Sequence, residues 1–480
     1  MIAKYVLIYS NLTKPVKASL WFIICFVIQR GLQFLGMPIF TRIMSQEDYG
    51  IYSVFLSWTN LLCVMSSLSI YNGVFNKAAV KYEELRDQYI SSVQYLTLLV
   101  GLLMSLVILF FHQSLEEWTG FPYKLLLLMC IHILLFPSFQ YWAQKQRFLF
   151  EYKKLVVLTL LNSFLSLLLG ITFVVFSEDK AFALIMVTVG VQAVINLLLF
   201  VSLAQKGHCF YRKDFWLWSL ISALPLIPHF LSEILLGHAD RIMINQMCGP
   251  AQAGIYNIVY QISMIMTIIR TGINGSYTPW VYISLKAGRY DAIRKNTSVI
   301  TVMMATMTFL LILIGPEILW LAAPHSYYEA IIDMPAIMIG CYFIFVYVLF
   351  LNIEIYYEQN QYVAIASCIS AVLSIVANVV FIPVYGYLSC GYTTMLSYML
   401  MAVLHYYFFK KVCMRNPEAK DVFDINNLLR ISTILTILGI SALSLYENHL
   451  LRWIVIMFLV LILSVKRNQA LTILKELRSK

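Results

Sequence analysis

Charged side chains are scarce in this sequence. Only 12% of the 480 residues are Asp, Glu, Lys or Arg, whereas 61% are hydrophobic. Soluble globular domains carry about 25% charged residues, so the composition excludes an ordinary water-soluble fold. The mean hydropathy of +0.78 agrees, and the sequence therefore predicts an integral membrane protein.

Motifs for metal, nucleotide and redox chemistry are also missing. The nine cysteines are scattered without a Cys-x-x-Cys pair, no histidines stand near them at ligand spacing, and no glycine-rich phosphate-binding loop occurs. We expect no cofactor, no bound metal and no ATP-driven step. The net charge is +10, but no basic run is dense enough to indicate a nucleic-acid partner.

Long apolar runs are what the sequence has in abundance. Most are about 18 to 25 residues long, which suits the roughly 30 Å of a bilayer core, and only a helix satisfies its own backbone there. We predict an all-α integral membrane protein with about fourteen transmembrane helices, the last of them short; without the terminal pair, twelve would remain. The predicted spans are 18–40, 50–71, 90–111, 123–143, 155–176, 181–204, 216–236, 254–277, 297–321, 332–351, 362–382, 391–410, 427–446 and 452–465.

Basic residues set the predicted orientation. With the N-terminus inside and the chain alternating, inside segments hold 27 of the 34 Lys and Arg residues and outside segments hold five. Positive charge concentrates on the cytoplasmic side of membrane proteins, so we expect both termini in the cytoplasm. One inside loop, 352–361, has no basic residue and carries Glu354 and Glu358.

An internal repeat relates the two halves. The tripeptides Arg-Ile-Met and Gly-Ile-Tyr occur at 42–44 and 50–52 and again at 241–243 and 254–256, six predicted helices apart. An even number of helices gives both copies the same orientation, as in one class of secondary transporter. We predict an N-terminal lobe over 1–210, a C-terminal lobe over 211–415, and two extra helices with a cytoplasmic tail over 416–480.

Polar side chains interrupt two of the predicted spans near mid-membrane. Arg30 lies twelve residues into the first span, with Gln33 close by. Placing Arg at that depth costs at least about 2.5–3.5 kcal/mol, so something must offset the cost. In the eighth span, Arg270 and Asn274 belong to a polar stripe at helical spacing that also includes Ser263 and Thr267.

The seventh span adds His229 and Glu233 one turn apart, after Pro225 and Pro228, which should bend or break it. His229 precedes its Arg-Ile-Met copy by the same twelve residues as Arg30 does. One interpretation is a positive cavity, lined by both arginines and His229, that holds an anion. The other is an ion pair of Glu233 with an arginine. Glu233 or His229 is also a candidate proton carrier for antiport.

Three segments resemble one known family. They are 38–52 (Pro-Ile-Phe-Thr-Arg-Ile-Met-Ser-Gln-Glu-Asp-Tyr-Gly-Ile-Tyr), 224–228 with the downstream Asp240-Arg241, and 382–387 (Ile-Pro-Val-Tyr-Gly-Tyr). The chain resembles the bacterial polysaccharide flippases of the Wzx type, which export O-antigen and capsule repeat units and share a superfamily with the multidrug and toxin extrusion (MATE) transporters.

The resemblance implies two six-helix lobes around a central cavity and a substrate of undecaprenyl-pyrophosphate carrying an oligosaccharide. It implies transfer from the inner to the outer leaflet of the bacterial cytoplasmic membrane, with a polysaccharide polymerase and a chain-length regulator as further partners besides membrane lipids. In such flippases, cavity arginines engage the pyrophosphate. We assign that role to Arg30 and Arg270 by depth and polarity, with Gln33, Asn274 and His229 beside them.

Two alternatives compete with a flippase. A MATE-type drug or cation antiporter should present acidic groups, whereas Glu233 is the clear intramembrane acid here. A membrane polysaccharide polymerase or glycosyltransferase needs outward loops with paired carboxylates or a metal. The longest predicted outer loop, 237–253, holds one Asp. We therefore expect a transporter and not an enzyme.

Overall fold

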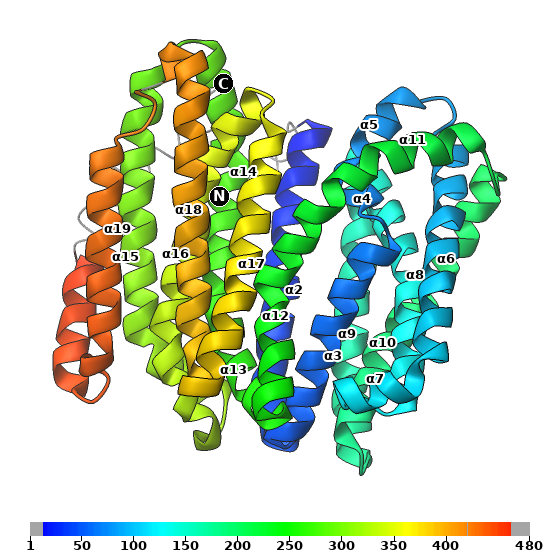
Figure 1. Cartoon of the computed structure of the whole chain (residues 1–480), viewed down its shortest axis with the longest axis horizontal. Coiled ribbons are helices and arrows are strands. Elements are labelled where there is room, and N and C mark those ends of the chain that lie inside the picture. Colours follow the sequence, from blue (N-terminus) through cyan, green and yellow to red (C-terminus); the bar gives the residue numbers. More distant parts are fainter. Residues whose placement is uncertain (1–12, 420, 462–480) are drawn as a thin grey trace, which may run out of the picture. The chain divides into compact units, whose positions relative to one another are not determined.

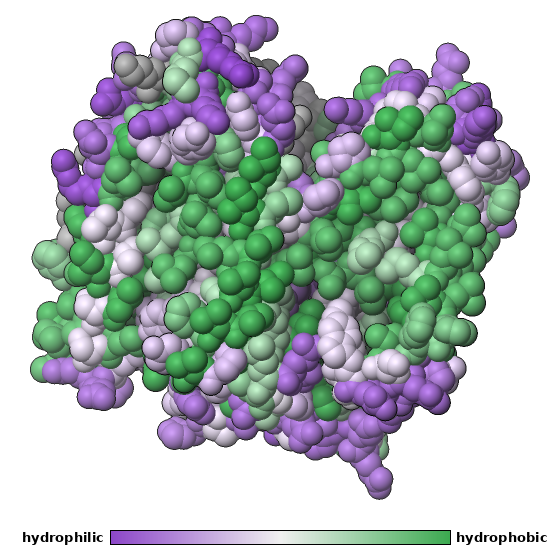
Figure 2. All heavy atoms as spheres, viewed as in Figure 1, coloured by the Kyte–Doolittle hydropathy of each residue, from purple (hydrophilic) through white to green (hydrophobic). Residues whose placement is uncertain are grey.

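The computed structural model describes residues 13–419 and 421–461, and every regular element in them is a helix. Two compact units emerge from its contacts, Met1–Gly254 and Ile255–Lys480. In both, apolar side chains cover the middle of the helices and hydrophilic ones gather at the helix ends (Figure 2). This is the surface of a multi-pass membrane protein.

The first unit consists of a bundle of long helices with several short ones at their ends (Figure 1). Its elements are α2 (Lys14–Ile43), α3 (Gln46–Ser66), α4 (Ile70–Gly73), α5 (Phe75–Lys81), α6 (Arg86–Phe110), α7 (His112–Thr119), α8 (Tyr123–Phe148), α9 (Tyr152–Phe176), α10 (Lys180–Gly207), α11 (Lys213–Ala223), the 3-10 turn η1 (Leu224–Leu226) and α12 (Ile227–Cys248). Helix α8 packs on α10 and α6, α2 packs on α9, and α12 packs on α3.

The second unit is built around α16, whose most apolar window is 94% buried. A helix that is hydrophobic on all sides belongs in a core, and α16 packs most extensively on α18. Helix α13 (Pro250–Ser263) enters this unit. Its further elements are α14 (Ile265–Lys286), α15 (Tyr290–Ala322), η2 (His325–Asp333), α16 (Met334–Tyr356), α17 (Asn360–Tyr385), η3 (Tyr387–Ser389), α18 (Cys390–Arg415), η4 (Pro417–Ala419), α19 (Ile425–Ser441) and η5 (Ala442–Leu445).

The predicted all-helical membrane fold is confirmed, but the count of fourteen spans is not. Within residues 13–419 and 421–461, twelve helices are long and apolar enough to cross a bilayer. The second predicted span corresponds to α3, which has 21 residues but does not reach that apolarity. The fourteenth corresponds to a shorter apolar helix, His449–Leu461, and its predicted end at 462–465 lies outside the described residues.

Two predicted loops turn out to be helical. The outer loop predicted at 237–253 is occupied by α12 and α13, which meet at Gly249 with a φ of +106°. On the opposite side, α16 continues to Tyr356, so Glu354 lies within a helix and is fully buried. The prediction that Glu354 is a loop residue was wrong, because the helix and its burial continue past the predicted end of the span: Asn352, Ile353 and Glu354 are all buried.

The repeat is visible in local contacts of the first unit. The Arg42 guanidinium donates to the Pro38 carbonyl at 2.8 Å, and Arg241 donates to the Gly237 carbonyl at 2.6 Å, the same four-residue step back along the helix. A Cβ on Gly50 would stand 1.7 Å from the Pro250 carbonyl oxygen, and one on Gly254 would stand 2.9 Å from the Gly50 nitrogen. The two repeated glycines therefore mark the place where α3 meets the start of α13.

The predicted lobe boundaries, 1–210 and 211–415, follow this repeat and stay a prediction. The contact-based division falls later, at Gly254, because α12 packs against α3. The predicted interruption of the seventh span is confirmed. Its helix passes through the 3-10 turn η1 at Pro225 before α12 begins, since proline removes a backbone donor and its ring clashes with the preceding turn.

Candidate functional site

In the first unit, Arg30 and Gln33 lie together on one exposed stretch of α2. The Arg30 guanidinium donates to the Gln33 side-chain carbonyl at 3.1 Å and lies over the Phe26 ring, 5.5 Å from its centroid. Arginine side chains carry a positive charge throughout the physiological pH range. This arrangement offers both charge and hydrogen-bond donors to an anion.

His229 and Glu233 lie on α12, directly after the kink. The His229 Nε2 is 3.9 Å from a Glu233 carboxylate oxygen, and the two side chains are 17% and 46% exposed. The sequence placed these residues one turn apart and offered an arginine as the partner of Glu233; in the structure His229 lies within reach of its carboxylate. The carboxylate is therefore the more open of the two groups, and the imidazole is mostly covered.

In the second unit, Arg270 and Asn274 lie one turn apart on α14. The Arg270 Nε and the Asn274 side-chain oxygen are buried and make no hydrogen bond with any residue that the structure describes. An unsatisfied buried polar group costs about 1–3 kcal/mol. A polar ligand or water reaching these two atoms would recover that free energy.

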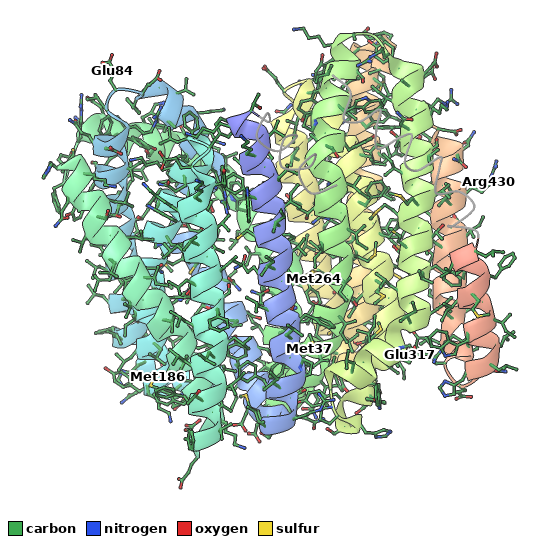
Figure 3. All side chains as sticks on the ribbon, turned by 180° about the vertical axis from the view of Figure 1, so that it is seen from behind. Met37, Glu84, Met186, Met264, Glu317 and Arg430 are labelled. Carbon is green, nitrogen blue, oxygen red and sulfur yellow. The ribbon has the colours of Figure 1, made fainter. Side chains whose placement is uncertain are left out.

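The polar stripe differs from the prediction in one respect. The helix is interrupted at Met264, which is labelled in Figure 3, so Ser263 ends α13 while Arg270 and Asn274 belong to α14. Ser263 is fully buried and its hydroxyl donates to the Val259 carbonyl at 2.9 Å. Ser263 therefore supports its own helix and does not extend the polar surface of Arg270.

A buried pair that the sequence did not reveal lies in the second unit. His405 of α18 and Glu354 of α16 are both fully buried, and the His405 Nδ1 lies 3.0 Å from each carboxylate oxygen. Tyr347 stacks on the imidazole at 5.3 Å. Glu354 is thus a further acid within the helices, which corrects the expectation of Glu233 alone, but its carboxylate is already engaged.

Helix α19 and the short helix after it are fastened by a further ion pair. Arg452 is completely buried and its guanidinium pairs with Glu317 of α15, which is labelled in Figure 3. Helix α15 also packs along α19. Glu317 and Arg452 act here as a structural clamp.

Chemically, the two groups of side chains are suited to binding. Each unit contributes one arginine and one amide from its predicted mid-membrane segment, and neither group contains the paired carboxylates that acid–base catalysis on a glycosidic bond requires. Arginine and amide donors recognise phosphate and sugar oxygens.

Comparison with solved structures defines the fold. The chain is similar to the lipid II flippase MurJ in an inward closed conformation (TM-score 0.66, 15% identity, 93% of this chain and 99% of that one). It is also similar to a multidrug resistance MATE transporter of the MOP superfamily in an inward-facing conformation (TM-score 0.62, 12% identity, 80% and 94%). A third similar structure is a MOP superfamily transporter from Pyrococcus furiosus with a binding pocket described as reversed in polarity (TM-score 0.55, 13% identity, 83% and 95%). At these identities the likeness establishes the fold, which is that of the MATE and MurJ transporters.

The chain belongs to the polysaccharide biosynthesis protein family, whose sequence model matches residues 16–285. It is also 26% identical over 165 residues to the Lsg locus putative protein 1 of Haemophilus influenzae, a match that spans 32% of this chain and 39% of that protein. The family indicated by the three sequence segments is therefore confirmed.

Proposed function

We propose that this protein is a flippase for lipid-linked oligosaccharides. It moves undecaprenyl-pyrophosphate-linked repeat units from the inner to the outer leaflet of the bacterial cytoplasmic membrane, for O-antigen or capsule synthesis. Membership of the polysaccharide biosynthesis family and the fold shared with a lipid II flippase support this proposal. A polysaccharide polymerase and a chain-length regulator are the expected partners downstream.

The observation that carries the proposal is the placement of Arg30 and Arg270. Each lies well inside a helix that is long and apolar enough to cross the membrane, where an arginine is costly and by default indicates a functional site. A sugar pyrophosphate cannot cross hydrocarbon unaided, since an uncompensated ion there is far costlier than a neutral polar group. Guanidinium groups that replace its water lower that barrier, and the polyprenyl tail can remain in lipid.

The roles follow from the chemistry of each side chain. Arg30 and Arg270 contact the phosphates, Gln33 and Asn274 hydrogen-bond to phosphate or sugar oxygens, and His229 adds charge when protonated. Glu233, 3.9 Å from His229, is the candidate for coupling to a proton. This protein's own chemistry is transport, with no bond made or broken in the substrate.

The test is genetic. Deleting the gene from its host should abolish surface polysaccharide and leave lipid-linked repeat units on the cytoplasmic side. The wild-type gene should restore the surface polysaccharide and clear the accumulated repeat units, whereas R30A and R270A should do neither. The matched control is R430A, because Arg430 is an exposed arginine on α19 outside the repeat (Figure 3). Normal surface glycan together with drug hypersensitivity in the deletion would contradict the proposal and favour a drug antiporter.

A further inference from the structure

A pocket in the first unit lies where α2 and α9 begin. It has a volume of about 450 Å³ and is lined by the turn before α9 and by the first residues of both helices. Helices α2 and α9 pack against each other, and both are membrane-spanning candidates. The pocket therefore lies at the level where these two helices leave the membrane.

The pocket is strongly basic. Lys14 and Lys17 of α2 and Lys153 and Lys154 of α9 line it together with one acid, Glu151, so its net formal charge is +3. Glu151 lies 3.8 Å from Lys154, whose side chain is 75% exposed. The N-terminal ends of two helices, of 30 and 25 residues, add the positive ends of their dipoles. These charges together favour a phosphate group.

Aromatic side chains mark the pocket as a membrane-interface site. Trp21 and Tyr152 stack with their centroids 6.3 Å apart and their planes 6° from parallel. Such residues concentrate at the headgroup level. Phe150, which lines the pocket and is 40% exposed, has a φ of +55°, an uncommon backbone conformation for a bulky residue. Hydrogen bonds from the Phe150 and Glu151 N–H groups to the carbonyls of 147 and 146, at 3.1 and 2.8 Å, hold this turn.

Apolar surface continues from the pocket along both helices. Leu20 of α2 is 40% exposed and Val157 of α9 is 66% exposed, each about one turn beyond the pocket lysines. A ligand with its phosphate among the lysines can therefore place acyl chains against the protein. A soluble phosphate would gain nothing from this apolar surface.

We propose that this pocket binds the headgroup of an anionic phospholipid in the leaflet next to the N-terminal ends of α2 and α9. Basic pockets at the ends of membrane helices are a recognised mode of binding doubly charged lipid headgroups. A volume of about 450 Å³ lies toward the small end of ligand sites, which run from about 300 to 1,000 Å³. It suits a phosphate headgroup better than a pyrophosphate with an oligosaccharide attached.

The proposal is tested by native mass spectrometry of the full-length protein with cardiolipin and phosphatidylglycerol. K153Q/K154Q and K14Q/K17Q should each bind cardiolipin on the order of tenfold more weakly than wild type, because each removes two charges from the headgroup site. The control K410Q/K411Q also removes two adjacent lysines, from the end of α18, and should bind as wild type does.

Three outcomes would overturn the proposal. The first is that both pocket variants bind cardiolipin as tightly as wild type does. The second is that the control K410Q/K411Q loses as much cardiolipin binding as the pocket variants do. The third is unchanged phospholipid binding with lost binding of a lipid-linked oligosaccharide, which would assign the pocket to the substrate. Phospholipid binding is measured without transport, so its failure leaves the flippase proposal intact, and a failed flippase test leaves this site intact.

Discussion

Buried charge in the second unit occurs in two forms. Glu354 and His405 are fully buried and contact each other at 3.0 Å, so each offsets the other's desolvation. Arg270 has a buried Nε that no described residue accepts from. The pair stabilises the packing of α16 on α18, whereas the Arg270 Nε can take a polar ligand or water as its acceptor.

Removing His405 should therefore be costly. H405A leaves the Glu354 carboxylate buried without its partner, and breaking such a pair costs about 3–5 kcal/mol. We expect a clear fall in Tm for H405A in detergent and a smaller fall for E354Q, because the amide oxygen still accepts from the imidazole. His325, which is exposed in η2, provides the control H325A with an unchanged Tm. An equally unchanged Tm for H405A would contradict a structural role for the pair.

Asp179 illustrates a charge outside the membrane. Its carboxylate accepts from the Phe182 N–H at 2.9 Å as the N-cap of α10 and lies 2.5 Å from the Lys124 ammonium. Partial burial alone would raise the pKa of Asp179, but these hydrogen bonds and the lysine charge outweigh it and lower the pKa.

Because the folded pKa lies below the unfolded one, the stabilisation from Asp179 is complete above the ordinary carboxyl pKa and disappears as the pH falls through the folded value. D179A should cost about 1 kcal/mol near neutral pH, and the difference in Tm from wild type should shrink in acid. D179N should retain most of the cap. A difference that grows as the pH falls would contradict this assignment.

At the residue level, the sequence predicted how deep a side chain lies in the membrane better than it predicted which side chain it contacts. The position of Arg30 within its span follows from counting along a helix of known rise. The partner of Glu354 is 51 residues away on another helix, and neither composition nor periodicity pairs two such positions. The contact of His229 with Glu233 was predictable because both lie on one helix, one turn apart.

At the scale of elements, the repeated Gly-Ile-Tyr segments mark a close approach of two helices. Gly50 of α3 has no room for a Cβ beside the Pro250 carbonyl, and Gly254 of α13 faces the Gln46 and Gly50 backbone. Small residues let membrane helices approach closely. The repeat thus explains why glycine stands at both positions.

G50A should destabilise the protein by more than about 2 kcal/mol, since a methyl group would overlap backbone that cannot move aside as a side chain can. The matched control is G190A in α10, where a Cβ meets nothing within 4 Å. That change should leave Tm equal or slightly higher, because alanine favours helix over glycine. A small effect of G50A, within the range of G190A, would show that α3 and the start of α13 are not in such contact.

Interruptions of helices were predictable only where proline causes them. The turn η1 coincides with Pro225, which was expected to bend the span. The interruption at Met264 and the left-handed residues Leu68 and Ser69 after α3, with φ near +50°, have no proline or glycine at the site. Tertiary packing, which a single sequence does not display, imposes them.

At the scale of the whole molecule, the distribution of basic residues predicts an orientation with both termini in the cytoplasm. Single cysteines in a cysteine-free background test this with a membrane-impermeant maleimide. E117C and H325C should react in intact cells, whereas K154C and K411C should react only after permeabilisation. The reverse pattern would invert the topology, and labelling of all four in intact cells would contradict the predicted alternation.

The most direct test of the central claim is translocation by purified protein. Proteoliposomes would carry a fluorescent undecaprenyl-pyrophosphate oligosaccharide in both leaflets, and a membrane-impermeant quencher would report the fraction that reaches the outside. We predict that wild type and R430A make nearly all of the label accessible, while R30A and R270A leave about half protected, as in empty liposomes. Wild-type transfer by R30A and R270A, or protection of half the label by wild type itself, would contradict the claim that intramembrane arginines carry the pyrophosphate across.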